Sequence, residues 1–184
     1  SGSATFLGET LARFPLVQPD WYIDAQGKLQ QAVATVTASG TLTYFNSLDS
    51  AMAAACAVPA ATVTLYRNAT LSATATIPLN CDITLCAGDE VTADRSGTLF
   101  DVYGKLTLES AAPLTLKGTG SGSLVIVREG GELTLKDGVT LTGGLAGGGG
   151  GGVNNSGTFV MTGGLITNCW TMSGGGGVLN NASG

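Results

Sequence analysis

The sequence contains no histidine, few charged residues and few aromatic residues. Charged residues make up 11% of its 184 positions and aromatic residues 6%. Without histidine, the chain lacks the side chain that most often acts as a general base at neutral pH and that commonly binds zinc. Its four cysteines show no spacing typical of a metal site. The sequence therefore predicts no cofactor.

Long apolar runs and an excess of positive charge are also missing. No apolar run approaches the roughly 20 residues that span a bilayer, so we expect no membrane insertion. The net charge of -5 disfavours nucleic acid as a partner. Apolar residues, by contrast, make up 43% of the chain, which also has 29 glycines. Because disordered chains are poor in apolar residues, this chain is expected to fold.

Three near-copies of one segment occur at residues 100–110 (FDVYGKLTLES), 127–137 (VREGGELTLKD) and 153–163 (VNNSGTFVMTG). Each copy carries a glycine near its middle, and these glycines, Gly104, Gly131 and Gly157, follow one another at a nearly constant interval. A fixed period in the twenties, carried by short strand-like segments, predicts a solenoid in which successive copies stack.

Short triplets with two apolar residues around a central, mostly threonine, position recur from Val63 onward. One set comprises residues 63–65, 83–85, 114–116 and 139–141, and a second comprises 106–108, 133–135 and 159–161. In a strand the outer two residues face one side and the middle residue faces the other. Stacked triplets then give apolar ladders inside and threonines outside. This pattern predicts an all-β fold, a parallel β-helix of about five coils over residues 61–184.

Charges support this alignment of the copies. Placing the first copy on the second, so that Gly104 lies on Gly131, brings together three pairs of opposite sign: Asp101 with Arg128, Lys105 with Glu132, and Glu109 with Lys136. Residues stacked on neighbouring strands lie about 5 Å apart, where opposite charges attract. We therefore expect these six charged residues to specify the stacking of the coils.

The segment before the solenoid predicts a helix over residues 47–56. Ser47 is a suitable N-cap, alanines fill the body, and Pro59 follows the end. One face of the helix is apolar, formed by Leu48, Met52 and Cys56. An amphipathic helix at this point is expected to cover the open end of the first coil. Residues 44–60 are thus predicted to be a capping helix.

Residues 1–43 are predicted to form a small N-terminal extension. Apolar spacing favours a short helix over residues 5–14, and residues 20–23 suggest a short strand or loop. Residues 33–37 and 41–45 alternate around a turn and predict a hairpin.

The cysteines leave several pairings open. Cys81 and Cys86 flank a strand-like segment whose extended length holds them too far apart for a disulfide. Cys56 could pair with either of them, or all four, including Cys169, could remain buried thiols.

Glycine runs at residues 147–152 and 174–177 recur once per coil and fall between strands. They predict corners where positive φ angles or close backbone approach are needed. The asparagines that follow suit tight turns, and we expect them to stack as a hydrogen-bonded ladder.

The segment GGGVNNSGTFVMTGGLITN at residues 150–168 resembles the repeat of pectin-lyase-like right-handed β-helix proteins. These occur as secreted or wall-attached adhesin-like proteins of Gram-positive bacteria. Residues 44–52 and 61–66 look like their N-terminal cap and first strand, so the resemblance covers about residues 44–184. It implies a right-handed β-helix on the cell surface or secreted. Because this fold carries unrelated activities, function has to be argued from a site.

The outward strand positions argue against catalysis. They carry residues that cannot act as general acids or bases at neutral pH, namely Thr64, Thr84, Thr107, Thr115, Thr134, Thr140 and Val160. Glu129 and Asp137 align with turns rather than with a groove. We expect a non-enzymatic protein, with a polysaccharide lyase or glycoside hydrolase as the alternative. A weak calcium site at Asp89, Glu90 and Asp94 competes with a solvated turn.

Five aromatic residues could stack on sugar rings: Trp21, Tyr22, Tyr66, Tyr103 and Trp170. Trp170 either projects from a corner or covers the core. We expect an adhesin-like segment that binds a glycan or a host surface protein, with a passive stalk as the other alternative. The repeat runs up to Gly184, so either further coils follow in the native protein or the segment self-associates end to end through the open β-helix end.

Overall fold

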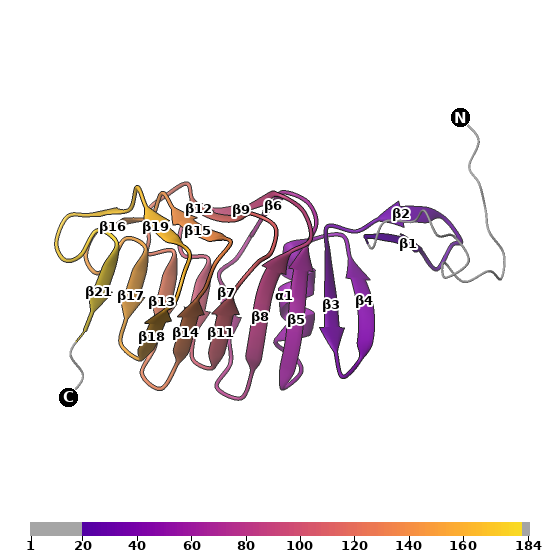
Figure 1. The fold of residues 1–184 in the computed structure, drawn as a ribbon, viewed down its shortest axis with the longest axis horizontal. Helices are drawn as coiled ribbons and strands as arrows, with labels where there is room; N and C mark the ends of the chain where they lie inside the picture. The colour runs from indigo at the N-terminus through magenta and orange to yellow at the C-terminus, as the bar shows by residue number, and fades with distance from the viewer. Residues whose placement is uncertain (1–19, 182–184) are drawn as a thin grey trace.

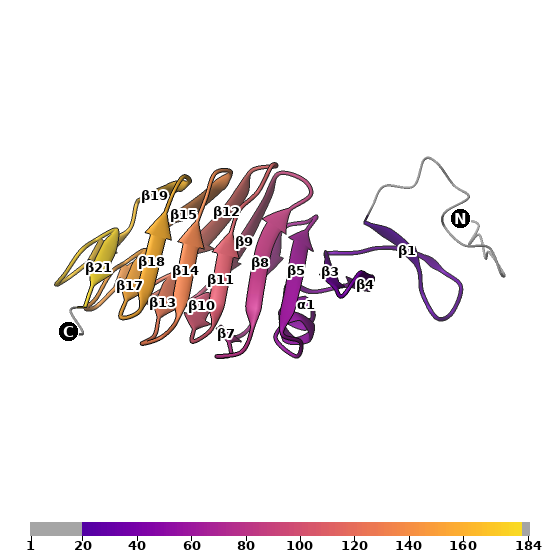
Figure 2. The same cartoon turned by 60° about the horizontal axis from the view of Figure 1, so that its bottom comes forward.

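The computed structural model describes residues 20–181, which form an all-β solenoid of about five turns with mostly parallel sheets. Three sheets run along the solenoid, one of seven strands and two of five, and two further sheets have two strands each. Figures 1 and 2 show the strands stacked turn upon turn along the long axis of the molecule. The predicted β-solenoid is thus confirmed.

The seven-stranded sheet extends along the whole solenoid. Its strands, in spatial order, are β18 (Thr158–Met161), β14 (Glu132–Leu135), β11 (Lys105–Leu108), β8 (Asp82–Ala87), β5 (Ala60–Leu65), β3 (Ala34–Ala38) and β4 (Thr41–Phe45). From β18 to β5 all neighbours are parallel. β3 is antiparallel to β5, and β4 is antiparallel to β3. Two reversals restore the direction, so the two edge strands β18 and β4 run the same way.

The two five-stranded sheets are entirely parallel. One contains β7 (Ala75–Ile77), β10 (Phe100–Val102), β13 (Val125–Val127), β17 (Val153–Asn155) and β21 (Val178–Asn180). The other contains β6 (Ala69–Thr70), β9 (Val91–Arg95), β12 (Leu114–Gly118), β15 (Val139–Thr142) and β19 (Leu165–Thr167). None of the triplets that the sequence pattern identified lies in the first of these sheets, so the pattern did not predict this sheet.

The two-stranded sheets lie beside the coils. β1 (Trp21–Ile23) and β2 (Leu29–Gln31) form an antiparallel hairpin, and β16 (Leu145–Ala146) pairs in parallel with β20 (Trp170–Thr171). In Figure 1 the β1–β2 hairpin lies beyond β4, at the N-terminal end of the solenoid.

Grouping the triplets into two sets by sequence was partly wrong. The triplets at residues 63–65 and 83–85 lie in β5 and β8, in the same sheet as Leu106 and Leu133, and not with Leu114. All of these triplets have the same apolar-threonine-apolar pattern. The sheet to which each triplet belongs therefore depends on the lengths of the corners between strands, and the triplet pattern carries no information on those lengths.

The interior is filled by stacked aliphatic side chains. Leu106 pairs with Leu133, and Leu108 with Leu135, and all four are buried. Full burial of such a side chain contributes about 1.5–3 kcal/mol. At the last strand the same ladder ends with Phe159, which is half-buried, and Met161, which is 47% exposed.

The predicted charge pairs are confirmed, since all three form ion pairs at 2.6–2.8 Å. Lys105 lies opposite Glu132 in the seven-stranded sheet, and Phe100 lies opposite Val125 in a five-stranded sheet. The chain therefore uses more residues to go from Lys105 to its partner Glu132 than from Phe100 to its partner Val125. Coil length thus differs between sheets, because the corner after β13 holds residues 128–131 and the matching corner after β10 only 103–104.

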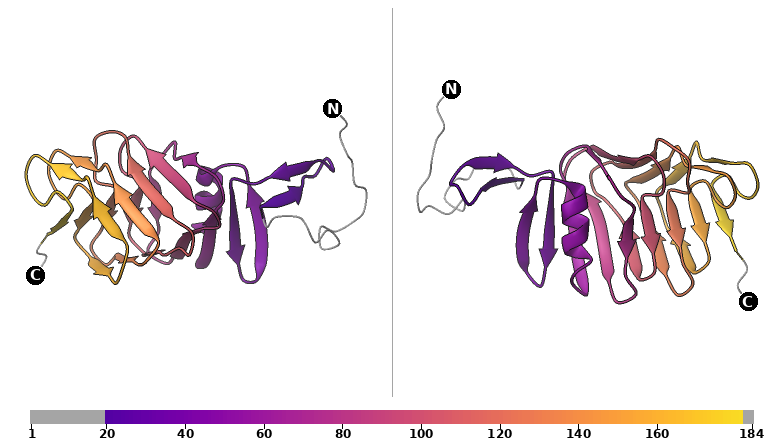
Figure 3. Two further views of the ribbon diagram at one scale, coloured as in Figure 1. Left: turned by 45° about the horizontal axis from the view of Figure 1, so that its top comes forward. Right: turned by 180° about the vertical axis from the view of Figure 1, so that it is seen from behind.

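The predicted helix is confirmed as α1 (Leu48–Ala55), the single helix among the described residues. The Ser47 hydroxyl accepts a hydrogen bond from the Ser50 amide at 3.2 Å, as an N-cap should. The helix buries four side chains, Leu48, Ala51, Met52 and Ala55, and packs against β3, β4, β5 and β7. Figure 3 shows it at the N-terminal end of the coils.

The predicted hairpin is also confirmed, as β3 and β4 joined by Ser39 and Gly40, whose φ angles are 49° and 77°. It does not belong to a separate extension, because β3 pairs with β5 and continues the main sheet. A domain boundary at residue 43 would divide β4. The helix predicted over residues 5–14 lies outside the described residues.

All four cysteines are free thiols. The Cys81 thiol donates to the Cys56 carbonyl oxygen at 3.3 Å, so these two residues are neighbours. The expected asparagine ladder is present at the C-terminal end, where Asn155 donates to Asn180 at 2.9 Å and Asn181 donates to Asn154 at 2.8 Å.

Candidate binding surface

Two tyrosines stack where the β1–β2 hairpin meets β4. The rings of Tyr22 and Tyr44 lie 5.0 Å apart, centroid to centroid, and are inclined by only 13°. The Tyr22 hydroxyl donates to the Asn46 side-chain oxygen at 2.8 Å, which fixes the orientation of the ring. Both rings are half-buried, so part of each is accessible to a ligand.

Tyr66 extends this pair into a row along the outer face of the seven-stranded sheet. Thr35 lies opposite Tyr44 across β3 and β4 and hydrogen-bonds to Tyr66. The Tyr66 ring lies against Gly88, so close that a Cβ at position 88 would overlap the ring. Burial raises the pKa of Tyr66, so its hydroxyl keeps its proton and its ability to donate at neutral pH. We call Tyr22, Tyr44 and Tyr66 the tyrosine row.

Carboxylate and amide groups surround the tyrosine row. The buried Asp20 accepts a hydrogen bond from the Gln31 amide at 2.6 Å, and it lies near enough to Tyr66 to act on it electrostatically. Asp24 accepts from the Gln30 amide at 3.0 Å, and this bond lowers the pKa of Asp24. Both carboxylates are thus held in place as hydrogen-bond acceptors.

A shallow hollow of about 390 Å³ continues the surface beyond Tyr66. Its lining comprises Cys86, Glu109, Ser110, Ala111, Lys136 and Asp137. Cys86 connects it to the row, because its thiol lies 3.3 Å from the Thr64 hydroxyl and acts electrostatically on Tyr66. Within the hollow, Lys136 donates to Glu109 at 2.6 Å. That carboxylate is therefore engaged in a coil-to-coil ion pair.

The remaining predicted aromatics lie elsewhere. Trp21 lies on the opposite face of the hairpin from Tyr22, because successive strand residues alternate. Tyr103 lies under the Arg128 guanidinium, whose central carbon is 5.7 Å from its ring centroid. Trp170 is in β20 and is 55% exposed, so it projects outward and does not cover the core. Of the five predicted residues, the structure groups Tyr22 with Tyr66.

Tyr44 is the member of the row that sequence reasoning missed. It is the fourth residue of β4, in a hairpin that was interpreted as part of a separate extension. The alternation of β4, with Leu42 and Tyr44 on the face opposite Thr43 and Phe45, was a usable signal.

The predicted calcium ligands are not brought together. Asp89 and Glu90 are exposed in the turn between β8 and β9, where the Asp89 carboxylate accepts the Glu90 amide at 2.8 Å. Asp94 lies within β9. Among residues 20–181, no group of three acidic, cysteine or histidine side chains could hold a metal ion.

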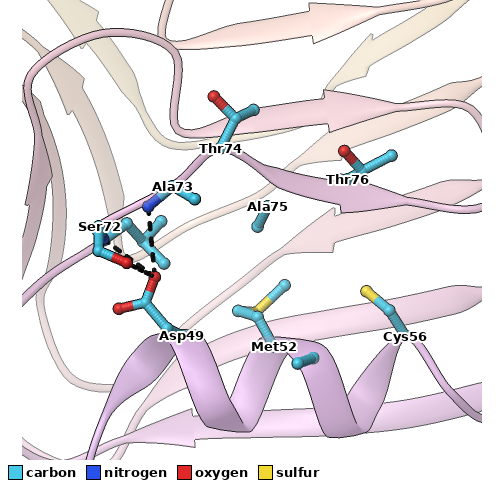
Figure 4. Close-up of a pocket in the computed structure, with 10 residues that line it drawn as sticks. Asp49, Met52, Cys56, Ser72, Ala73, Thr74, Ala75 and Thr76 are labelled. Carbon is cyan, nitrogen blue, oxygen red and sulfur yellow. Dashed lines mark hydrogen bonds between the residues drawn. The ribbon is translucent and has the colours of Figure 1, made fainter.

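A second hollow, also of about 390 Å³, lies between α1 and the segment before β7 (Figure 4). Asp49 joins its two sides, accepting hydrogen bonds from the Ser72 amide and hydroxyl, each at 2.9 Å. Met52 and Cys56 contribute an apolar wall. Burial raises the pKa of Cys56 to about 11, so the thiol is protonated at neutral pH and is a poor nucleophile.

Comparisons with protein-family models, with curated proteins and with solved structures give no match. None of the helices in the described part of the chain is long and apolar enough to cross a membrane. The tyrosine row is thus the most developed candidate site in the described part of the chain.

Proposed function

We propose that this chain is a non-enzymatic, adhesin-like segment of a right-handed β-helix that binds carbohydrate through the tyrosine row. The observation that carries the proposal is the gathering of Tyr22, Tyr44 and Tyr66 on one outer face. Sugar rings present an apolar C–H face and a hydroxyl edge. Half-buried tyrosines offer a matching apolar face and a polar tip.

The groups around the row supply the polar part of such a site. Ligand sites combine apolar and aromatic surface with a few fixed polar groups. The half-buried Asp24 is fixed by Gln30 and can accept hydrogen bonds from sugar hydroxyls, whereas the buried Asp20 is fixed by Gln31 beneath the row. The adjoining hollow beside Glu109 and Lys136 offers room for a further unit of a chain-like glycan.

The resemblance to secreted or wall-attached adhesin-like proteins supports a location outside the cell, secreted or at the cell surface. It also supports a right-handed coil and a capping role for α1. The helix buries one full face against β3, β5 and β7, as a cover over the first coil would. In this function the solenoid is a rigid support that presents the row.

Glycan-array and host-matrix binding with the purified chain tests the proposal. Tyr22→Ala removes one ring of the stack and should weaken binding about tenfold, or about 1.4 kcal/mol. Tyr66→Phe keeps the ring against Gly88 and removes only the hydroxyl, so it should cost less.

Two exposed aromatics remote from the row serve as controls. Tyr103→Ala and Trp170→Ala should leave binding unchanged. A signal lost on Trp170→Ala but kept on Tyr22→Ala would move the site to the other end of the solenoid. No signal on any glycan or matrix protein would favour a passive stalk. Release of reducing ends or unsaturated products from polysaccharides, with or without calcium, would favour the enzymatic alternative.

A further inference from the structure

Two of the four cysteines are neighbours at the N-terminal end of the solenoid. Cys56 is the C-cap of α1, and Cys81 directly precedes β8. The hydrogen bond of 3.3 Å from the Cys81 thiol to the Cys56 carbonyl oxygen holds the Cys81 sulfur against the backbone of residue 56. Cys81 also acts electrostatically on the Cys56 thiol, which is a second sign that the two side chains lie close together.

The other two cysteines are held elsewhere. Because strand residues alternate between faces, Cys86 lies on the opposite face of β8 from the position of Cys81. Its thiol contacts the Thr64 hydroxyl on the outer face of the sheet. Cys169 donates to the Thr167 carbonyl oxygen at 3.3 Å, in the corner between β19 and β20 near the other end of the solenoid. The structure thus separates Cys81 from Cys86 as partners for Cys56, which the sequence does not.

Cys56 is also within reach of small molecules. It is half-buried and lines the hollow between α1 and the segment before β7, whereas Cys81 is only 8% exposed. Figure 4 shows the Cys56 side chain rising from the end of α1 toward the strand that carries Thr76. An oxidant that enters the hollow therefore meets Cys56 first, with Cys81 behind it.

We propose that Cys56 and Cys81 are a redox pair that a small-molecule disulfide converts into an internal disulfide bond. The Cys56 thiolate attacks one sulfur of the small disulfide, forms a mixed disulfide and releases one thiolate. The Cys81 thiolate then attacks the Cys56 sulfur, forms the internal bond and releases the second thiolate. Two cysteine sulfurs are oxidised, the small disulfide is reduced to two thiols, and the two cysteine protons pass to the released thiolates or to water.

The internal bond would close one complete coil of the solenoid into a covalent ring. The segment between the two cysteines contains β5, β6 and β7, and β8 then stacks on β5 with Asp82 opposite Ala60. The bond would also tie the C-terminal end of α1 to this first coil. Such a bond persists in oxidising surroundings, which agrees with the location outside the cell proposed above, but it does not depend on the tyrosine row.

Only a small rearrangement is needed to form the bond. The Cys81 side chain gives up its hydrogen bond to the Cys56 carbonyl oxygen and turns toward the sulfur of the same residue. Since burial raises the pKa of Cys56 to about 11, little of its thiol is ionised at neutral pH. The thiolate is the attacking species, so oxidation of the folded chain should accelerate about tenfold per pH unit between pH 7 and 9.

Two full-length variants, each with two cysteines, test the pairing. Cys86→Ser with Cys169→Ser keeps Cys56 and Cys81, and Cys81→Ser with Cys169→Ser keeps Cys56 and Cys86. Each chain is incubated with oxidised glutathione, treated with an alkylating reagent and weighed by mass spectrometry under denaturing conditions. The first chain should become lighter by two hydrogen atoms and take up no alkyl group. The second should stop at a mixed disulfide with glutathione on Cys56.

The two chains also give the results that would overturn the proposal. It is overturned if the first chain keeps both thiols free or stops at mixed disulfides, and equally if both chains form an internal bond at the same rate. Serine at position 81 can still donate to the Cys56 carbonyl oxygen, so the second chain should keep its fold. Circular dichroism spectra that match the wild type verify this for both chains before oxidation.

Melting the first chain in both redox states tests the closed coil without a further substitution. Because a disulfide restricts the unfolded chain, the oxidised form should melt about 5–10 °C above the reduced form. Dithiothreitol should return the melting temperature to that of the reduced form. An oxidised form that melts at or below the reduced form would show that the bond distorts the first coil, and the proposed pair would then be wrong.

Discussion

Arg128 binds Asp101 across one turn of the solenoid, donating from Nε at 2.6 Å and from Nη2 at 2.9 Å. The two residues are not opposite each other in a ladder. Asp101 lies in β10 opposite Ile126, while Arg128 follows β13 in a corner. The long arginine side chain thus connects the corner of one coil to the strand of the coil before it.

Replacing this carboxylate should have a small effect. Asp101→Asn removes the ion pair but keeps a hydrogen-bond acceptor, and the arginine side chain is 44% exposed. We expect the free energy of unfolding to fall by about 1 kcal/mol or less, measured by urea denaturation. The difference should shrink in high salt. A loss several times larger would mean that the pair holds the fold rather than the register.

The repeated glycines should tolerate substitution poorly. A Cβ on Gly104 would meet the carbonyl oxygens of Pro78 and Cys81 in the preceding coil. Gly104→Ala should therefore cost about 1–3 kcal/mol in unfolding free energy through backbone displacement. Gly147→Ala is the matched control, because a Cβ there meets nothing within 4 Å. Equal melting temperatures for the two variants would contradict the role of close packing.

The interior ladder should show the cost of a cavity. Leu133 is fully buried between Leu106 and Phe159, so Leu133→Ala should destabilise the fold by about 2–5 kcal/mol. Leu79→Ala removes the same atoms from a side chain that is 70% exposed and should be nearly neutral. Chemical denaturation of both variants, compared at one temperature, measures the difference.

Stability should fall at alkaline pH. The pKa of Cys56 is raised from 9.0 to about 11 by burial, so the folded state holds a proton that the unfolded chain releases. The contribution of the protonated Cys56 thiol to the free energy of unfolding is complete below pH 9 and is lost as pH rises from about 9 to 11. The raised pKa of Tyr66 acts in the same direction. Melting temperatures measured from pH 8 to 11 should decline.

Cys56→Ala separates the thiol from other alkaline effects. Its melting temperature should decline less steeply over the same interval, whatever its value at pH 8. Parallel declines for the variant and the wild type would show that Cys56 does not control the alkaline loss.

Local patterns were sufficient to predict much of the fold. The Ser47 cap, the spacing of Leu48 and Met52, and the alternation in β3 and β4 are signals within a few residues of one another. The stacking of β11 on β14 was predictable because Lys105 and Glu132 carry opposite charges at the right interval. These features depend on short-range propensity and on one simple period.

The parts that were missed depend on contacts between distant segments. The sheet of β7, β10 and β13 has three-residue strands without the apolar-threonine-apolar pattern, so it emerges only when the coils stack. The meeting of Tyr22 with Tyr44 requires the hairpin β1–β2 to dock beside β4. No spacing in the sequence encodes that approach.

The corners of the solenoid differ in length, so they tolerate extra residues that its strands could not accept. The chain takes a longer step between β11 and β14 than between β10 and β13, and the ladders nevertheless stay in phase. The extra residues in the corner between β13 and β14 leave the pairing of β13 with β10 and of β14 with β11 intact. Corners such as the exposed Gly147 and Gly148 are thus natural points for insertion. New recognition loops could be grafted there while the hydrogen-bonded frame remains unchanged.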